Sequence, residues 1–315
     1  MQLIRGLHNI NAEHRGCVAT IGTFDGVHLG HKAVLNQLAE HAKRLNLPAV
    51  VITFEPTPQE FFTPETAPAR LSRLREKLET FQQSQVDYVL CLRFDDGLAS
   101  LDADEFVGRV LVNGLQIRYL VVGDDFRFGR ERKGDFDQLI AAGKMHDFPV
   151  ENTATLYHDE QRVSSTRVRQ ALQEGDMTLA SDLLGRPYTI SGRVKLGQQR
   201  GRSIGFPTAN IALHRNRMPL QGVFAVAVHG LEDWSLPGVA NLGTRPTVDG
   251  VESILEAHIF DFDREIYGQH IQVEFVTKIR EEKKFESFDA LKQQIQMDAL
   301  AARDHFSRLI DSKLV

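Results

Sequence analysis

The sequence predicts an α/β domain built on a parallel sheet, followed by an antiparallel β domain that ends in a helix. In the first half, short apolar strands alternate with helical patterns, whereas strand patterns dominate from residue 188 onward. The length of 315 residues suits two hydrophobic cores better than one. The segment "GRP" interrupts a helical pattern at residues 185–187, so we expect one domain over 1–184 and a second over 185–315.

The first domain contains apolar segments that are typical of buried strands. They cover residues 17–22, 48–54, 86–94, 117–126 and 148–156. Apolar residues at helical spacing follow the first strand over 31–46, and a second helix is expected over 102–115. Strands joined by helices form a parallel sheet that is covered on both faces, and its ligands gather at the carboxyl ends of the strands.

The second domain shows the two-residue period of half-buried antiparallel strands. Strands are expected over 222–231, 252–262 and 270–279. Glycines punctuate these segments, as turns and barrel bends require. A final helix is expected over about 287–310, with Ser287 as its N-cap.

Composition indicates an ordinary globular protein that acts on small molecules. Apolar residues make up 42% and charged residues 25%, and the net charge of −5 gives no positive field for nucleic acid or anionic membranes. No signal-peptide core or apolar run of about 18 residues is evident. Cys17 and Cys91 lie in strand-like segments, where buried thiols are favoured over a disulfide. We expect a cytoplasmic monomer or weak homo-oligomer without nucleic-acid or membrane partners.

The segment "GTFDGVHLGH", residues 22–31, lies between a strand and a helix. A glycine-bearing turn at a helix start presents backbone N–H groups and the helix dipole to an anion. Gly22, Gly26 and Gly30 allow the backbone to approach a ligand closely. His28 and His31 add imidazole donors that stabilise charge developing at phosphorus. Two alternatives are surface histidines beside a turn and a metal site, although no third ligand is obvious.

The four residues 28–31 resemble the HxGH signature of nucleotidyltransferases, which class I aminoacyl-tRNA synthetases share. The longer segment resembles that of bacterial FAD synthetases. The resemblance implies a Rossmann-like, doubly wound nucleotidyltransferase domain with His28 and His31 in catalytic roles. The loop residues that it would assign to nucleotide binding are Gly22, Phe24, Asp25, Gly26 and Gly30.

The segment "VGDDFRFGRERKGD", residues 122–135, follows a strand and combines carboxylates, arginines and aromatic rings. It resembles the flavin-side loop of the same family. The resemblance implies that Asp125, Phe126 and Phe128 contact FMN, with Asp125 at a position where the family often has Asn. The alternative is a solvated charged loop.

The segment "RVSSTRVRQAL", residues 162–172, opens a helix with residues that cap well, among them Ser165 and Thr166. Arg162 and Arg169 lie nearby for charge-assisted contacts to an anion. The segment resembles the family's ISSTxxR motif, which implies that these four residues bind the departing pyrophosphate. Alone, the segment could be merely a helix cap.

The segment "GRVKLGQQRGRSIGFPTANI", residues 192–211, is the most specific in the chain. Its glycines suit a loop that wraps phosphates, and Pro207 fixes its own backbone angle φ. Thr208 and Asn210 project oxygens to one side of an extended segment, which suits Mg²⁺. The segment matches the GFPTAN signature of riboflavin kinases; the alternative is a tight loop between barrel strands. The expected ATP contacts are Gly197, Gly201, Arg202, Gly205 and Pro207.

A kinase acting on an alcohol needs a proton acceptor near the attacking oxygen. The resemblance implies that Glu256 in "LEAHIFDF" has this role, because the family has a glutamate before the "H…D" pattern of this strand. The resemblance also implies a nucleotide contact by Asn241 in "GVANLGTRPTV". It places Arg280 and Glu282 of "KIREEKKFESFDAL" near the flavin ring. The alternative for Glu256 is an ordinary surface carboxylate, and the alternative for "KIREEKKFESFDAL" is a charged surface in contact with solvent.

Together the motifs resemble those of prokaryotic bifunctional riboflavin kinase/FAD synthetases over nearly the whole chain. The resemblance implies that the second domain transfers the γ-phosphate of ATP to riboflavin, and that the first joins FMN to the AMP part of another ATP. Mg²⁺ and ATP would be required, and riboflavin, FMN and FAD would be substrates or products. The rival classes are an amino-acid-activating synthetase, which predicts a KMSKS-type loop that we do not find, and a flavin carrier that has lost turnover.

Overall fold

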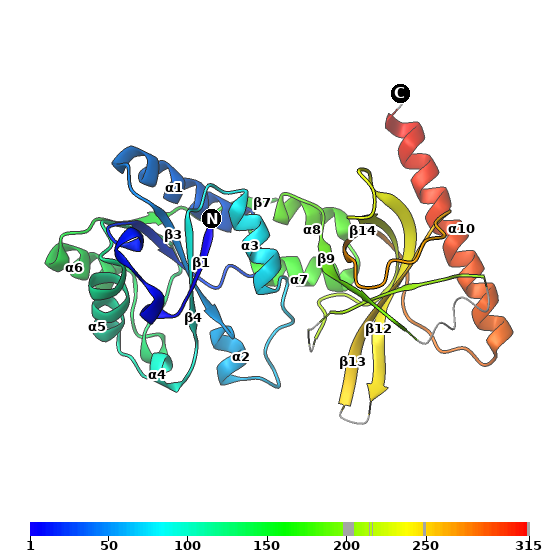
Figure 1. The fold of residues 1–315 in the computed structure, drawn as a ribbon, viewed down its shortest axis with the longest axis horizontal. Helices are drawn as coiled ribbons and strands as arrows, with labels where there is room; N and C mark the ends of the chain where they lie inside the picture. Colours follow the sequence, from blue (N-terminus) through cyan, green and yellow to red (C-terminus); the bar gives the residue numbers. More distant parts are fainter. Residues whose placement is uncertain (198–204, 214, 216, 248–249, 314–315) are drawn as a thin grey trace. The chain divides into compact units, whose positions relative to one another are not determined.

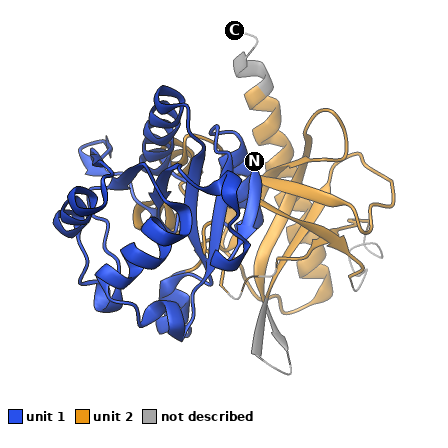
Figure 2. Ribbon diagram, turned by 60° about the vertical axis from the view of Figure 1, so that its left-hand side comes forward, with its two compact units in different colours: residues 1–68, 72–165 blue, residues 69–71, 166–315 orange. Residues whose placement is uncertain are grey.

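The computed structural model describes residues 1–197, 205–213, 215, 217–247 and 250–313 (Figure 1). They form two compact units, which Figure 2 distinguishes by colour. Unit 1 comprises residues 1–68 and 72–165, and unit 2 comprises residues 69–71 and 166–315. Helices α7 (Ser165–Glu174) and α8 (Met177–Leu184) therefore fall almost entirely in unit 2.

Unit 1 contains a six-stranded sheet in the order β1-β4-β3-β2-β5-β6, and every neighbouring pair is parallel. The predicted parallel sheet is thus confirmed, with one additional edge strand at the N-terminus. The strands are β1 (Gln2–Arg5), β2 (Val18–Ile21), β3 (Ala49–Glu55), β4 (Tyr88–Arg93), β5 (Tyr119–Gly123) and β6 (Val150–Thr153). A hairpin of β7 (Tyr157–His158) and β8 (Gln161–Arg162) follows.

Helices cover both faces of this sheet because successive strand residues point to opposite sides. Cys17, Ala19 and Ile21 enter a core beneath the helices of residues 103–146, whereas Val18 enters a second core beneath α1 and α3. The helices of the first face are α5 (Ala103–Phe106), its π-helical continuation η3 (Val107–Leu115) and α6 (Phe136–His146). Those of the second are α1 (Leu29–Leu45) and α3 (Leu74–Gln82). Shorter helices are η1 (Leu7–Asn9), η2 (Ala12–His14), α2 (Pro58–Phe62), α4 (Asp96–Ala99) and η4 (Arg130–Arg132).

Helix α1 is held by polar contacts in its C-terminal half, away from His28 and His31. Tyr119 and Gln37 donate hydrogen bonds to Glu151 on β6, and His41 Nε2 lies 2.8 Å from the same carboxylate. The Tyr119 hydroxyl is the largest cause that lowers the pKa of Glu151. Val34, Leu35, Leu38 and Ala42 form the buried stripe of the helix. The start of α1 is therefore held on a well-anchored helix.

We expect neither cysteine to react with Ellman's reagent in the native protein. Cys17 is 0% and Cys91 5% exposed, and neither takes part in a disulfide. Burial raises the pKa of Cys17 to about 12, so this thiol stays protonated at neutral pH, while the thiolate is the reactive form. Both should react once the chain is unfolded in guanidinium. Rapid native labelling of either cysteine would contradict the buried positions.

Unit 2 contains a closed antiparallel barrel in the order β10-β13-β12-β11-β14-β9. The three strands expected here are confirmed as β13, β11 and β14, and the barrel is completed by three others. The strands are β9 (Thr189–Lys195), β10 (Ala209–Ile211), β11 (Gly222–His229), β12 (Leu236–Thr247), β13 (Gly250–Ile259) and β14 (His270–Arg280). The predicted final helix is confirmed as α10 (Phe288–Lys313), where Ser287 Oγ accepts the N–H of Ala290 at 3.1 Å.

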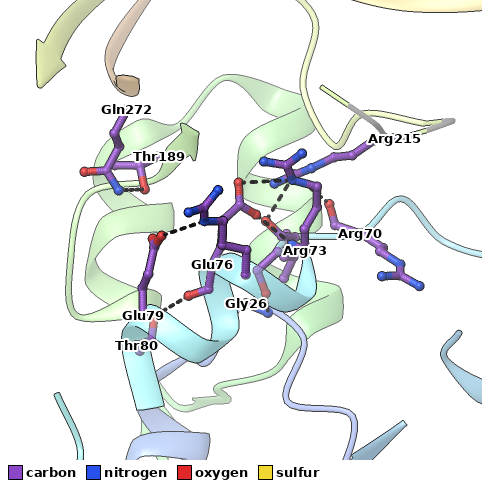
Figure 3. A network of polar contacts seen from close by, with 12 residues as sticks. Gly26, Arg70, Arg73, Glu76, Glu79, Thr80, Thr189, Arg215 and Gln272 are labelled. Carbon is purple, nitrogen blue, oxygen red and sulfur yellow. Dashed lines mark hydrogen bonds and ion pairs between the residues drawn. The ribbon is translucent and has the colours of Figure 1, made fainter. Parts of the chain in front are cut away.

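The segment 69–71 belongs to unit 2 through hydrogen bonds to its carbonyl groups. Buried Arg215, which Figure 3 labels together with Arg70, donates to the carbonyls of Arg70 and Leu71, each at 3.3 Å. The Tyr188 hydroxyl donates to the carbonyl of Leu71 at 3.2 Å. Arg169 Nε donates to the carbonyl of Ala69 at 2.7 Å. Residues 69–71, which interrupt unit 1 in the sequence, thus belong to unit 2.

Candidate active sites

The first candidate site lies where β2 leads into α1. His28 is the N-cap of the helix, and its Nδ1 accepts the backbone N–H of His31 at 3.3 Å. In the neutral ring the proton is therefore on Nε2, which can donate to a ligand. The two imidazoles stack with centroids 3.7 Å apart. A side chain at Gly30 would approach the His28 ring to 3.2 Å, which explains the glycine between the histidines.

Phe24 was expected to contact the nucleotide, but its side chain is buried. Its side chain is 2% exposed and packs between the rings of His31, at 5.2 Å, and Phe81, at 5.4 Å. A Cβ at Gly22 would lie 3.0 Å from the Phe24 ring. Phe24 therefore supports His31 from inside the unit, and Gly22 makes room for it.

Asp25 and Gly26 are held by two serines. The Asp25 carboxylate, 7% exposed, accepts the N–H of Ser72 at 3.1 Å, and Gly26 N–H donates to Ser72 Oγ at 2.9 Å. Ser165 Oγ donates to the carbonyl of Asp25 at 2.8 Å. Within unit 1, the structure thus joins two motifs that the sequence assigned separately to phosphate, through the contact of Ser165 with Asp25. Ser72 carries no motif and was not predicted.

One residue predicted to bind pyrophosphate, Arg162, forms an ion pair with one residue predicted to bind the flavin, Asp125. Arg162 lies 2.8 Å from the carboxylate of Asp125 and 3.2 Å from that of Asp124. Phe126 is half-buried and stacks on Phe128 at 5.7 Å, while Phe128 itself belongs to the core. Of the three predicted flavin contacts, Asp125 and Phe126 are therefore the accessible ones. The remaining pyrophosphate candidates, Thr166 and Arg169, lie on α7 within unit 2.

An aromatic cluster that sequence reasoning missed follows the carboxyl ends of β3 and β4. Phe61, Phe62 and Phe94 contact one another with centroids 5.2–5.6 Å apart, and Phe54 contacts Phe94 at 5.8 Å. Phe62 is 61% exposed. An aromatic ring left in water at this edge of a parallel sheet is a surface on which a flat ligand can stack.

The second candidate site is a polar row across three barrel strands. Glu256 on β13 pairs directly with Asn210 on β10 and, on its other side, with Asn241 on β12. Directly paired residues on neighbouring strands share one face of a sheet, so these three side chains lie side by side. Three residues separated by up to 46 positions in sequence, and each predicted for the kinase reaction, are thereby brought together.

Gly197 and Pro207 both make close contacts near β10. Gly197 lies against the side-chain amide of Asn210, where a Cβ has no room. The carbonyl oxygen of Pro207 accepts a hydrogen bond from His258 Nδ1 at 2.8 Å. Gly205 has a left-handed φ of +85°, and Thr208 directly precedes β10. Gly201 and Arg202 lie outside the described residues.

Arg280 and Glu282 have neighbours within unit 2. The Arg280 guanidinium binds Asp298 of α10 through Nε, at 2.9 Å, and Nη2, at 2.7 Å, and its Nη1 donates to the carbonyl of Glu281. Asp298 is 4% exposed, so this ion pair ties α10 to β14. The carboxylate of Glu282 covers Gly243 on β12. The flavin contacts of both residues stay predictions.

Comparisons with known proteins match two consecutive parts of the chain to two different families. Residues 10–167 match the family model described as FAD synthetase, and residues 184–306 match the model described as riboflavin kinase. A bifunctional riboflavin kinase/FMN adenylyltransferase of Escherichia coli (strain K12) is 52% identical, over 97% of this chain and 98% of that protein. A protein of the same description from Pseudomonas fluorescens is 54% identical, over 96% of this chain and 97% of its own length.

A solved structure is also similar over nearly the full length. It is described as a macrolide-efflux protein from Streptococcus pneumoniae, is 32% identical, and superposes with a TM-score of 0.81 over 96% of this chain and 98% of the other. Among the residues described here, no helix has both the length and the apolar character needed to cross a membrane.

Proposed function

This chain belongs to the family of bifunctional riboflavin kinase/FMN adenylyltransferases, and we propose on that premise how its residues carry out the two reactions. The enzyme phosphorylates riboflavin to FMN and adenylylates FMN to FAD. The observation that carries the assignment is that the two family models match consecutive parts of one chain. We propose residues 1–184 as the adenylyltransferase domain and 185–315 as the kinase domain.

In the kinase reaction, the ribityl hydroxyl of riboflavin attacks the γ-phosphorus of ATP and ADP leaves. Glu256 accepts the proton of that hydroxyl, and the flanking amides of Asn210 and Asn241 orient the carboxylate and the nucleotide. The support is the register of the three strands, which places both asparagines directly beside Glu256. Because the protein mainly positions groups in phosphoryl transfer, we expect the proton acceptor to contribute moderately.

Thr208 and Asn210 would hold Mg²⁺ in this site. Both offer neutral oxygen donors, which suit an ion that keeps several waters and relies on substrate phosphates for further ligands. Asn210 lies directly beside Glu256 in the strand register, and its side-chain amide is next to Gly197. When bound, the ion neutralises charge on the phosphates. Gly197, Gly201, Arg202, Gly205 and Pro207 are proposed to surround the ATP phosphates.

In the adenylyl transfer, a phosphate oxygen of FMN attacks the α-phosphorus of ATP and pyrophosphate leaves. We assign His28 and His31 as donors to the oxygens of that phosphorus. The support is the position of His28 at the start of α1 and the inferred Nε2 proton. Gly22, Asp25, Gly26 and Gly30 shape the loop beneath the nucleotide, and Phe24 supports His31.

The remaining assignments of this site concern the pyrophosphate and the flavin. Ser165, Thr166 and Arg169 on α7 are proposed to bind the pyrophosphate. Arg162 is proposed to bind a phosphate in exchange for its ion pair with Asp125. Asp125 and Phe126 form the flavin side, and the buried Phe128 supports Phe126 through their stacked rings. The exposed ring of Phe62 offers a stacking surface for the flavin ring.

We also propose that the protein works in the cytoplasm, as a monomer or weak homo-oligomer, on small-molecule substrates alone. The acidic net charge of −5 supports the absence of a nucleic-acid partner.

The proposed function is tested by chromatography of flavins after incubation with riboflavin, ATP and Mg²⁺. We expect riboflavin to fall, FMN to rise and then fall, and FAD to accumulate. Riboflavin that remains unchanged would remove the kinase assignment. FMN that accumulates without any FAD would remove the adenylyltransferase assignment. A carrier without turnover would bind the flavin and leave it intact.

A further inference from the structure

We propose that Lys77 is a positioning residue of the adenylyl-transfer site. Its ammonium group holds the loop of residues 23–27, which leads directly to the histidine pair, and Ser72 assists it. This inference rests on the proposed assignment of adenylyl transfer to the first domain. Lys77 belongs to α3, carries no recognised motif, and has no part in the chemistry described above.

The first observation is the complete burial of a lysine. Lys77 is 0% exposed and its Nζ donates a hydrogen bond to the carbonyl oxygen of Thr23 at 3.0 Å. Lysine is almost never fully buried unless its charge is paired or hydrogen-bonded, because the ammonium group must be removed from water. The carbonyl that it binds belongs to the residue directly after Gly22, at the entry to the loop.

The second observation is backbone strain in the loop that Lys77 holds. Phe24 has a φ of +49° and Val27 a φ of +43°, in the left-handed region that a β-branched residue such as valine rarely adopts. Both side chains are buried. Strained conformations of this kind persist only where surrounding contacts determine them, and they cluster at functional sites.

The third observation is that one short stretch, residues 72–77, holds the loop at several points. Ser72 exchanges two hydrogen bonds with Asp25 and Gly26, and five residues later Lys77 binds Thr23. The loop transmits its position to the site because the Phe24 ring contacts the imidazole of His31. A shift of Thr23 and Phe24 would therefore displace the catalytic histidines.

The cation also polarises the peptide group that it contacts. The carbonyl of Thr23 and the N–H of Phe24 belong to one peptide unit, so a positive charge at the oxygen makes that N–H a stronger donor. In a low-dielectric interior this effect reaches further than in water. Lys77 thus both holds the loop at Thr23 and makes the N–H of Phe24 a stronger donor.

The test is Lys77→Met, which keeps a long apolar side chain but removes the charge and the donor. We expect kcat for FMN adenylylation to fall by about tenfold or more and KM for ATP to rise severalfold, since a misplacement of 1 Å costs about 10²-fold. KM for FMN and riboflavin kinase activity should stay unchanged. Ser72→Ala should also lower kcat for FMN adenylylation and raise KM for ATP, but by smaller factors than Lys77→Met.

Lys144→Met is the matched control, because Lys144 is an exposed lysine on α6 in the same unit and its replacement changes the net charge equally. It should leave both activities unchanged. A purely structural role would reduce the amount of folded enzyme, which lowers Vmax without changing KM for ATP. Lys77→Met with an unaltered unfolding midpoint and unchanged kcat and KM would overturn the proposal. If that variant does not fold, unchanged constants in Ser72→Ala would overturn it instead. Absence of adenylylation in the unaltered chain would refute the proposed function itself.

Discussion

Replacing His31 with alanine is expected to stop FAD formation while FMN accumulates from riboflavin. His31 is stacked on His28, and the proposed role of the pair is to donate to oxygens of the α-phosphorus as charge develops there. Loss of one such donor costs about 10²–10³ in kcat. The measurement is the rate of FAD production from supplied FMN and ATP, followed by chromatography together with the rate of FMN production from riboflavin.

The same variant contains its own control for folding, because the kinase residues lie in the other unit. FMN production should therefore stay at the level of the unaltered protein. His146→Ala, at an exposed histidine near the end of α6, should change neither activity. Equal loss of both activities in a folded His31→Ala protein would contradict the assignment of two sites.

The converse result is expected from the barrel. Asn210→Ala removes a proposed Mg²⁺ ligand beside Glu256, and Glu256→Gln removes the proton acceptor while keeping the size of the side chain. Both variants should phosphorylate riboflavin much more slowly, with a loss of about 10²-fold for Glu256→Gln, at the lower end of what is typical for a general base. Supplied FMN should still be converted to FAD at the normal rate.

Glu265→Gln is a suitable comparison for Glu256→Gln, since Glu265 is an exposed carboxylate of the same unit. It should retain full kinase activity. If Glu256→Gln phosphorylated riboflavin as fast as Glu265→Gln, Glu256 would not be the proton acceptor. Glu256, Asn210 and Asn241 would then contribute only to the binding of substrates.

The fold class was predictable because both units follow simple periodic patterns. Buried parallel strands are continuous apolar runs, and the five such segments expected in the first half all form strands. Strand β12 was harder to predict because it contains two prolines and two glycines. It exists through pairing with β11 and β13 along its length, and a side chain at Gly238 would lie 2.5 Å from the carbonyl oxygen of His258.

The elements that carry chemistry were predictable where the motif is local. His28 and His31 share one helix start, and Thr208 and Asn210 share one extended segment. What the motif could not reveal is which way each side chain points. Phe24 and Asp25 belong to the same motif, yet their side chains point into the unit and serve the loop.

Residues that act on a motif from a distant part of the chain leave no local signal. Ser72 and Lys77 lie about fifty residues from the loop that they hold, and "SRLREK" is typical of the start of any exposed helix. Arg280 shows the opposite case. Because Arg280 lies in a charged run, its guanidinium looks available to a ligand in the sequence. In the structure it is bound by Asp298, which lies 18 residues later on α10. Only tertiary structure reveals such pairs.

The assignment of the two reactions is tested most directly by following the individual phosphates of ATP into the flavins. ATP labelled at the γ-phosphate should pass its label to FMN and from there to FAD. ATP labelled at the α-phosphate should label FAD and never FMN. Appearance of the α label in FMN, or FMN formed without the γ label, would contradict the assignment of the two reactions to a kinase site and an adenylyl-transfer site.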